Sequence, residues 1–453
     1  MSAEQASSCI ARLVEHMRVV DMGSDVFRSV GRAIVDTCAV GVAGIKEPAA
    51  LRVLSYLRQS GRVGSETAMS ASLWGVGTTG SVEEAALFNG VAAHVLDFDD
   101  VTSPLRGHPS VAMLPALIAL GEARAVSGDV LARAYIAGFE VMVRLAKSMT
   151  IPHYTRGWHS TATIGVMGAT AACALLEGLD PVQTAAAMGL AVAQASGTRA
   201  NFGYDAKSFQ AGITNASAVR AVLLAKEGFS ASPVALDSPI GFAALYGNGE
   251  SLADTFKLQK QLEVMSSGIE VKKYPLCYAT HRALDGMLDL RKEHSISLRD
   301  VRSVVVETSR GALDPLVHHS PKTGLEAKFS MEYAITAALC DGKISIASFQ
   351  DAAVLRPEIQ AFFPNVTARA SSEGDVLPRW TRLTINLQDG RSLVKTVKDL
   401  RGSAQLPLSD AELVEKAQDC FAWAGVDASA TVFGELAFDL ARNRVRDLMG
   451  ALG

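Results

Sequence analysis

Small side chains dominate the first half of the chain, and this feature restricts the fold more than any other. Alanine, glycine and apolar residues recur at helical spacing from about residue 5 to residue 230, with short connections such as Ser127-Gly128-Asp129. Alanine is densest at residues 169–174, 185–187 and 191–195. Helices approach closely where their facing side chains are small. The sequence therefore predicts a large, tightly packed all-helical domain.

Composition favours a soluble globular protein, with 49% hydrophobic and 20% charged residues. The longest uncharged runs, residues 160–176 and 181–198, are at or just under the length of a membrane span, and only four residues separate them. We interpret them as two buried helices and expect no membrane association. A net charge of -4 without long runs of like charge also makes nucleic acid an unexpected partner.

The N-terminus, MSAEQASSCIARL, lacks the basic and apolar segments of a secretory signal. Six cysteines are scattered without any CxxC pair, which indicates neither a zinc site nor a disulfide framework. Reduced thiols are typical of the cytoplasm, and we expect this protein to be cytoplasmic.

The composition changes near Ser267. Residues 301–308 are β-branched, residues 366–370 alternate, and residues 383–387 and 393–397 flank the hairpin signal Asp389-Gly390. Helical segments at residues 280–293 and 330–341 are interleaved with these strands, and residues 410–425 and 431–448 are helical again. The fold class expected is mainly α, with a helical domain at residues 1–265, an α+β lid domain at 266–400, and C-terminal helices at 401–453 that return to the helical domain.

Two local expectations accompany this division. Residues 66–79 are expected to be a connection, and the helix after it is expected to begin with a cap at Ser81, because Glu83 and Glu84 follow.

The polar stretch within the helical half is Asn89 to Leu117, NGVAAHVLDFDDVTSPLRGHPSVAMLPAL. His94, Asp97 and Asp100 are three residues apart, so a continuing helix would place them on one stripe. Ser103-Pro104 then ends that helix, and Ser110 would cap a helix that begins at Val111. Asp is also a common cap and turn residue, so any single aspartate here is equally well explained as structural. The stretch as a whole indicates a site between helices.

Four further stretches carry polar residues that a helical domain does not otherwise need. His159 precedes an apolar helix, Lys207 lies in a polar turn ahead of another helix, residues 272–281 open the small domain, and residues 328–333 open a helix. The candidate catalytic residues are Asp97, His108, His159, Lys207 and His281. An excess of imidazole and ammonium groups suits a small polycarboxylate substrate, whose deprotonation requires a base and nearby positive charge. Nucleotide and metal motifs are absent from the sequence, so we expect no cofactor and no metal.

These stretches together resemble the MmgE/PrpD family. The resemblance is carried by LDFDD, RGHPS, GWHSTATIG, the Lys207 turn, KKYPLCYATH and AKFSMEY, in this order and over nearly the whole chain. The family includes 2-methylcitrate dehydratase, cis-aconitate decarboxylase and iminodisuccinate epimerase. It implies a helical domain with an α+β lid, a homodimer, no cofactor and an active site at the junction. The matching motifs place in that site the five candidates named above and Tyr333.

Four additional residues are expected to bind substrate. Arg106 is a cationic anchor in the polar loop, and Lys272 and Lys273 can reach across a cleft between domains. In the decarboxylase branch a threonine directly follows DFDD, but Val101 stands at that position here, and Thr102 is the possible substitute. The loop from Asp100 to His108 is also about one residue longer than in that branch. The family's histidine in the Lys207 turn is Gln210 here. The RGHPS and KKYPLCYATH pieces are nearer to the epimerase-like bacterial branch.

The function expected is a cofactor-independent lyase that abstracts a proton next to a carboxylate of a small di- or tricarboxylate, as a 2-methylcitrate dehydratase or cis-aconitate decarboxylase does. Epimerisation of an iminodisuccinate-like acid is one alternative, and a non-catalytic carboxylate-binding homologue is another. The Asp-rich Mg²⁺ site of isoprenoid synthases would need a second carboxylate cluster, which the sequence lacks. In the favoured mechanism, His108 oriented by Asp97 moves the proton while Lys207 and His159 hold a carboxylate; His281 is the competing proton carrier.

Overall fold

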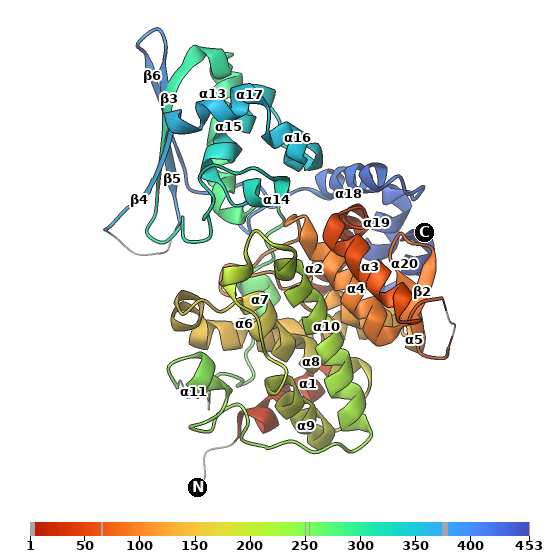
Figure 1. The fold of residues 1–453 in the computed structure, drawn as a ribbon. Helices are drawn as coiled ribbons and strands as arrows, with labels where there is room; N and C mark the ends of the chain where they lie inside the picture. Colours follow the sequence, from red (N-terminus) through yellow and green to blue (C-terminus); the bar gives the residue numbers. More distant parts are fainter. Residues whose placement is uncertain (1–4, 65–66, 250, 253, 374–378, 453) are drawn as a thin grey trace.

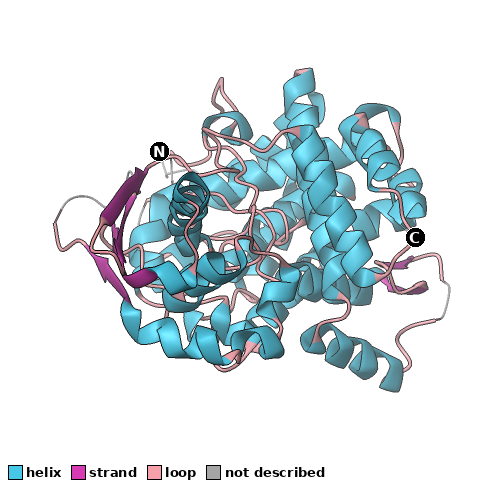
Figure 2. Cartoon of the chain, turned by 90° about the horizontal axis from the view of Figure 1, so that it is seen from above, coloured by secondary structure: helices cyan, strands magenta, loops and turns pink. Residues whose placement is uncertain are grey.

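The computed structural model describes residues 5–64, 67–249, 251–252, 254–373 and 379–452 (Figure 1). Helices make up most of these residues. Strands are confined to a four-stranded sheet on one side of the molecule and a short pair of strands on the opposite side (Figure 2). The expected fold class, mainly α with a smaller α+β domain, is confirmed. No helix in the described ranges has the length and apolar character needed to cross a membrane.

The helical domain is built from the first part of the chain. Its helices are α1 (Ala6–Val19), α2 (Ser24–Gly44), α3 (Pro48–Gln59), α4 (Val82–Val95), α5 (Leu114–Arg124), α6 (Gly128–Thr155), α7 (Ser160–Thr163), α8 (Gly165–Leu176), α9 (Pro181–Val192), α10 (Asp205–Lys226), α11 (Phe242–Tyr246) and α12 (Glu263–Ser266). The two uncharged runs of the sequence therefore form α7, α8 and α9.

Glycines allow the closest helix contacts in this domain. A Cβ added to Gly90 of α4 would lie 2.8 Å from the Cα of Gly212 in α10. A Cβ added to Gly138 of α6 would lie 2.6 Å from the carbonyl oxygen of Gly168 in α8. Real Cβ atoms do not approach other atoms so closely, so each pair needs glycine. The tight packing expected from the small residues is present at these crossings.

The segment before α4 differs from its prediction. Residues 66–79 were expected to be a plain connection, but β1 (Ser70–Leu73) and β2 (Thr78–Ser81) pair antiparallel; Glu66 lies outside the described residues. Each strand has only four residues, too few for alternation to be recognised in the sequence. The cap at Ser81 is confirmed, because its side chain accepts a hydrogen bond from the Glu84 amide.

The α+β domain is organised around β3 (Val301–Thr308). The strand order is β4-β3-β5-β6, where β4 (Val366–Ala370) is parallel to β3, and β5 (Thr381–Leu387) is antiparallel to both β3 and β6 (Ser392–Val397). The predicted Asp389-Gly390 hairpin joins β5 to β6. Helices α13 (His281–His294) and α15 (Met331–Asp341) pack on one face of the sheet (Figure 1). The shorter helices are α14 (Gly324–Ala327), α16 (Asp351–Val354) and α17 (Pro357–Phe362).

The described residues form two hydrophobic cores. One core runs from Ala6 to Val271 and continues from Leu408 to Leu452, with Ile346 in addition. The other runs from Tyr274 to Leu387. The C-terminal helices α18 (Asp410–Ala424), α19 (Ala430–Phe438) and α20 (Val445–Leu452) thus pack into the helical core. Residues 431–448 are not one helix as predicted, because the chain breaks between α19 and α20.

Candidate active site

The loop after α4 carries the central carboxylates. Helix α4 ends at Val95, and Asp97 adopts φ = 52°, the left-handed conformation that Asp tolerates better than most residues. The predicted stripe of His94, Asp97 and Asp100 is therefore wrong, because the helix ends before the second member. The predicted cap is also wrong, since α5 begins at Leu114 and not at Val111.

Asp100 has a structural role in this loop. Its carboxyl group accepts hydrogen bonds from the amide and the hydroxyl of Ser110, and the Ser110 hydroxyl lies 2.7 Å from that of Tyr135. Burial and the nearby Asp36 raise the pKa of Asp100 well above its usual value. A neutral, hydrogen-bonded carboxyl group that is wholly buried holds the loop in place.

Asp99 orients two imidazoles. Its Oδ2 atom lies 2.8 Å from Nδ1 of His94 and 3.0 Å from Nδ1 of His108. Nδ1 of His94 carries its hydrogen toward Asp99, and its Nε2 accepts from the ammonium group of Lys207. Nδ1 of His108 lies at ion-pair distance from the same oxygen, and a hydrogen on that nitrogen leaves the Nε2 lone pair of His108 available. Burial lowers the pKa of His94 to about 4 and also lowers that of His108, although Asp99 opposes the shift in both rings. Both imidazoles are neutral near pH 7.

Asp97 pairs with two ammonium groups from distant parts of the chain. Its Oδ1 accepts a hydrogen bond from Nζ of Lys207 at 2.6 Å, and its Oδ2 lies 3.0 Å from Nζ of Lys272. Burial alone would raise the pKa of Asp97, but the two lysines hold it well below its usual value. Nε2 of His108 lies 3.6 Å from Oδ1 of Asp97. Asp97 thus faces Nε2 of His108, whereas Asp99 lies beside Nδ1 of the same ring.

Three lysines from other parts of the chain form contacts with the loop after α4 and with the end of that helix. Lys207 lies in the first turn of α10, not ahead of it, and its Nζ also lies 3.1 Å from Nε2 of His94. Nζ of Lys272 donates to the carbonyl oxygen of Asp97 at 2.8 Å, and Nζ of Lys328 donates to the carbonyl oxygens of Leu96 and Pro275. Burial lowers the pKa of Lys328 to about 8.

His159 is held by the residue that replaces the family's histidine. Its Nδ1 lies 2.6 Å from Oε1 of Gln210, and Nε2 of Gln210 donates to the carbonyl oxygen of Thr198 at 3.1 Å, which fixes the amide orientation. The His159 ring stacks on His94 with centroids 5.8 Å apart. Burial and the neighbouring His94 lower the pKa of His159 well below its usual value. The side chain is a neutral imidazole whose Nε2 lone pair is free to accept.

A cavity of about 110 Å³ opens beside these groups, between the two domains. Seven of the ten predicted site residues line it: Asp97, Thr102, Arg106, His108, His159, Lys207 and Lys272. The other charged or polar residues around it include Tyr154, Thr161, Tyr278, Arg282 and Arg379. The cavity is small, strongly cationic and rich in neutral imidazole.

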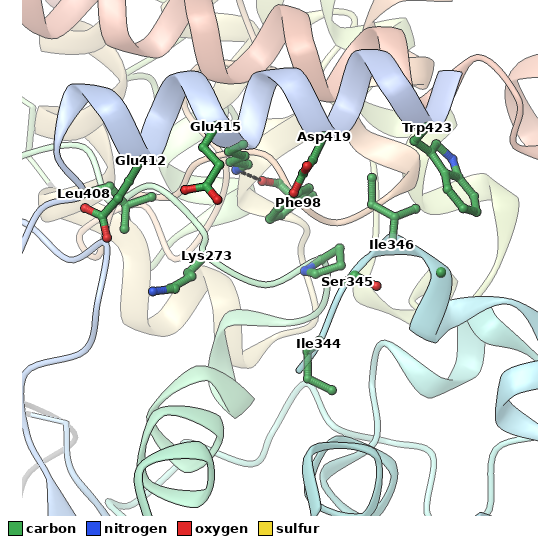
Figure 3. Close-up of a pocket in the computed structure, with 13 residues that line it drawn as sticks. Phe98, Lys273, Ile344, Ser345, Ile346, Leu408, Glu412, Glu415, Asp419 and Trp423 are labelled. Atoms are coloured by element: carbon green, nitrogen blue, oxygen red, sulfur yellow. Dashed lines mark hydrogen bonds between the residues drawn. The ribbon is translucent and has the colours of Figure 1, made fainter. Parts of the chain in front are cut away.

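Three predicted residues lie elsewhere. His281 is buried, its Nε2 lies 3.2 Å from the carbonyl oxygen of Leu276, and burial lowers its pKa to about 3. Tyr333 is buried among the helices of the small domain, where its hydroxyl donates to the carbonyl oxygen of Ser348. Lys273 lines a second cavity of about 530 Å³, in which α18 lies on one side and residues 344–346 on the other (Figure 3). This larger cavity contains no imidazole, so we place the chemistry in the smaller one.

Comparison with known proteins shows the family of the chain. The MmgE/PrpD N-terminal domain matches residues 8–255, and the MmgE/PrpD C-terminal domain matches residues 274–437. The chain belongs to the MmgE/PrpD family. The smaller cavity lies where the two family domains meet.

Three relatives from this family carry the name cis-aconitate decarboxylase. The human protein is 27% identical over 92% of this chain and 88% of its own length, and the Mus musculus protein is 28% identical over 92% and 86%. The Aspergillus terreus protein is 24% identical over 90% and 87%. A decarboxylase is a lyase, so the expectation of an enzyme of the lyase class is confirmed.

Sequence reasoning gave no role to several residues in and beside the cavity. Asp99 stood in the DFDD motif but had no assigned role, because the sequence does not show which carboxylate turns toward which imidazole. His94 was noticed only as part of a helical stripe. Arg282 directly follows His281, so the motif around His281 could have indicated it as a candidate. Arg379 lies near β5, and no motif in the sequence around it indicates a site.

The ligand atoms of His94, Asp99 and His108 lie within 4.8 Å of one another, which is close enough for a metal ion. The observed contacts are a hydrogen bond between Nδ1 of His94 and Oδ2 of Asp99, and an approach of His108 Nδ1 to 3.0 Å from the same oxygen. Lys207 and Lys272 add two positive charges beside this group. This donor set fits a hydrogen-bonded triad better than a cation site.

Proposed function

We propose that this chain is a cofactor-independent lyase that acts on a small polycarboxylate and transfers a proton on a carbon next to a carboxylate. The observation that carries this proposal is the neutral His108, held by Asp99 at Nδ1 with its Nε2 in a cationic cavity. An imidazole in this state accepts a proton from carbon, and as imidazolium it returns one.

The lysines supply the electrostatic part of the chemistry. Removing a proton or CO₂ next to a carboxylate leaves negative charge on an enolate-like intermediate. Lys207 and Lys272 meet at Asp97 on the cavity wall, so their ammonium groups are already placed to stabilise that charge. Their side chains are buried, which strengthens the interaction relative to water.

The names of the relatives favour cis-aconitate as substrate, with decarboxylation as the reaction. In that reaction the bond to one carboxylate carbon breaks and CO₂ leaves. Its electron pair forms a new carbon–carbon double bond, and the electron pair of the original double bond takes up one proton at the far carbon. We assign the delivery of that proton to His108 as imidazolium. A bound polyanion raises the pKa of nearby imidazoles, so substrate binding itself promotes protonation of His108.

Incubation of the purified protein with cis-aconitate, 2-methylcitrate and iminodisuccinate in D₂O tests the proposal. The expected outcome is CO₂ release from cis-aconitate with one deuterium entering the product at carbon, or loss of water from 2-methylcitrate with loss of a proton from carbon. Deuterium exchange into an acid that loses no group would instead favour the epimerase. Specific binding of these acids with neither turnover nor exchange would refute the enzyme and favour the carboxylate-binding homologue.

A further inference from the structure

Three arginines that line the cavity have no role in the imidazole and lysine cluster. They are Arg106 from the loop after α4, Arg282 from the start of α13, and Arg379 from the segment before β5. Among the described residues, none of the three has a carboxylate oxygen within 4 Å. Guanidinium groups that line one small cavity without a paired carboxylate are unfavourable unless an anion occupies the cavity.

We infer that Arg106, Arg282 and Arg379 form a second carboxylate subsite, through which the cavity selects tricarboxylates over dicarboxylates. The inference rests on the proposed function, because it assumes that another carboxylate of the same substrate lies against Lys207 and Lys272. It goes further by assigning a separate group of residues to the additional carboxylate that a tricarboxylate carries and a dicarboxylate lacks.

Arg106 is held in an unfavourable backbone conformation at the cavity. Its φ of 51° is left-handed, which costs a non-glycine residue roughly 1–2 kcal/mol. Two backbone hydrogen bonds close the turn: the Arg106 amide donates to the carbonyl oxygen of Ser103 at 3.2 Å, and the Thr102 amide donates to the carbonyl oxygen of Gly107 at 3.1 Å. The guanidinium then lies 5.2 Å from the Tyr154 ring. A strained backbone that directs a cation into a cavity is typical of a binding residue.

Arg282 is anchored by only one of its nitrogens. Its Nε donates to the carbonyl oxygen of Lys398 at 2.8 Å, and no described residue accepts from its two terminal nitrogens. The carboxylate whose charge acts most strongly on Arg282, Glu270, is engaged elsewhere: Oε1 accepts from the amide and hydroxyl of Ser103, and Oε2 accepts from the hydroxyl of Tyr278. The terminal edge of Arg282 is therefore available for a bidentate contact with a carboxylate.

The charges that act on the arginines differ from those that act on the imidazole of His108. Burial lowers the pKa of both Arg106 and Arg282, and in each case Arg379 contributes the largest repulsion from a neighbouring charge. The charges that act most strongly on His108 are instead Asp99, Lys272 and Lys207. A substrate that spans both groups needs carboxylates at two separated positions, in addition to the one at the reacting carbon.

The test compares two unreactive acids that differ by one carboxylate. Tricarballylate and glutarate share a five-carbon chain with carboxylates at both ends, and only tricarballylate carries a third carboxylate at the middle carbon. Isothermal titration at fixed ionic strength should show wild-type protein binding tricarballylate about 10- to 100-fold more tightly, the range of one charge-assisted contact. Arg282→Gln should reduce that ratio about tenfold and leave glutarate affinity nearly unchanged, and Arg282→Lys should restore part of it.

Arg299→Gln is the matched control, because Arg299 is exposed in the same domain and away from the cavity. Arg106→Gln provides an independent variant if Arg282→Gln does not fold, as judged by thermal unfolding. Equal affinity of the wild-type protein for the two acids would overturn the inference. A variant that loses affinity for tricarballylate and glutarate by the same factor would also overturn it. Absence of binding by either acid would overturn it as well.

The outcome is separable from that of the proposed function. A protein that turns over a dicarboxylate but binds the two test acids equally keeps the proposed function and loses this subsite. A protein that prefers tricarballylate through Arg282 but catalyses no turnover or proton exchange keeps the subsite and loses the proposed function.

Discussion

Lys416 is a buried cation that connects the C-terminal helix α18 to both chain segments of the site. Its Nζ lies 2.6 Å from Oδ1 of Asp36 and donates to the carbonyl oxygens of Phe98 and Lys272 at 2.8 Å each. The ammonium also lies 3.7 Å from the centre of the Phe98 ring. The first carbonyl belongs to the loop of Asp97 and Asp99, so this one side chain positions the carboxylates and Lys272 together.

Replacing Lys416 with Met keeps an unbranched side chain but removes the ammonium group, which leaves three polar groups without their partner. Breaking a buried ion pair by removing one member costs about 3–5 kcal/mol, and each unpaired carbonyl adds about 1–3 kcal/mol. Burial already raises the pKa of Asp36 despite the lowering effect of Lys416, so protonation of Asp36 offsets part of this loss. We expect Lys416→Met to lower the free energy of unfolding by about 4 kcal/mol.

The assay combines urea unfolding with hydrogen exchange at residues 96–101 and 270–273, because a chain with two cores need not unfold in one step. Exchange should rise in both segments, and kcat/KM should fall. Asp36→Leu combined with Lys416→Met should be more stable than Lys416→Met alone, since an apolar pair removes the stranded carboxyl group. Gln418→Met, an exposed change on the same helix, is the control. A loss below about 1 kcal/mol, with unchanged exchange in both segments, would refute the reasoning.

Three other outcomes are expected. Asp99→Asn should lower turnover by roughly 10²- to 10⁴-fold, because a neutral amide no longer fixes the tautomer of His108 or stabilises its imidazolium. Asp100→Asn should have little effect on turnover, since Asp100 is already neutral. Similar activity of the two variants would contradict this. His281 has a pKa of about 3 in the folded protein against about 6.5 unfolded, so the unfolded state binds the extra proton and stability falls as the pH drops from 6.5 toward 3. When the pH is lowered from 6.5 to 5, the free energy of unfolding of His281→Gln, measured by urea titration, should fall by about 1–2 kcal/mol less than that of the wild type. An equal fall in both proteins would show that His281 does not cause this pH dependence. Light scattering at micromolar concentration should give twice the 47.8 kDa of one chain, whereas a monomeric mass would exclude the homodimer that the family resemblance implies.

Local patterns in the sequence were sufficient for most of the architecture. The strand Val301–Thr308 and the hairpin at Asp389-Gly390 follow from β-branched runs and turn residues, which act over a few neighbours. The capped start of α4 at Ser81 is equally local. The short pair β1 and β2 was missed because four-residue strands depend on their partner and not on their own periodicity.

The residue types of the site were also evident from the sequence, since an alanine-rich helical domain has little structural use for so many imidazoles and ammonium groups. Tertiary structure alone decided their pairing. Asp97 and Asp99 are two residues apart, yet one meets Lys207 and Lys272 while the other meets His94 and His108. That division depends on the left-handed backbone at Asp97 and on segments more than 100 residues away. His281 and Tyr333 were assigned by motif, but the packing of the small domain turns them away from the cavity, and it brings Arg282 and Arg379 there instead. Side-chain direction is set by which elements pack together, and this is why the sequence specified the chemistry available but not the atoms that carry it.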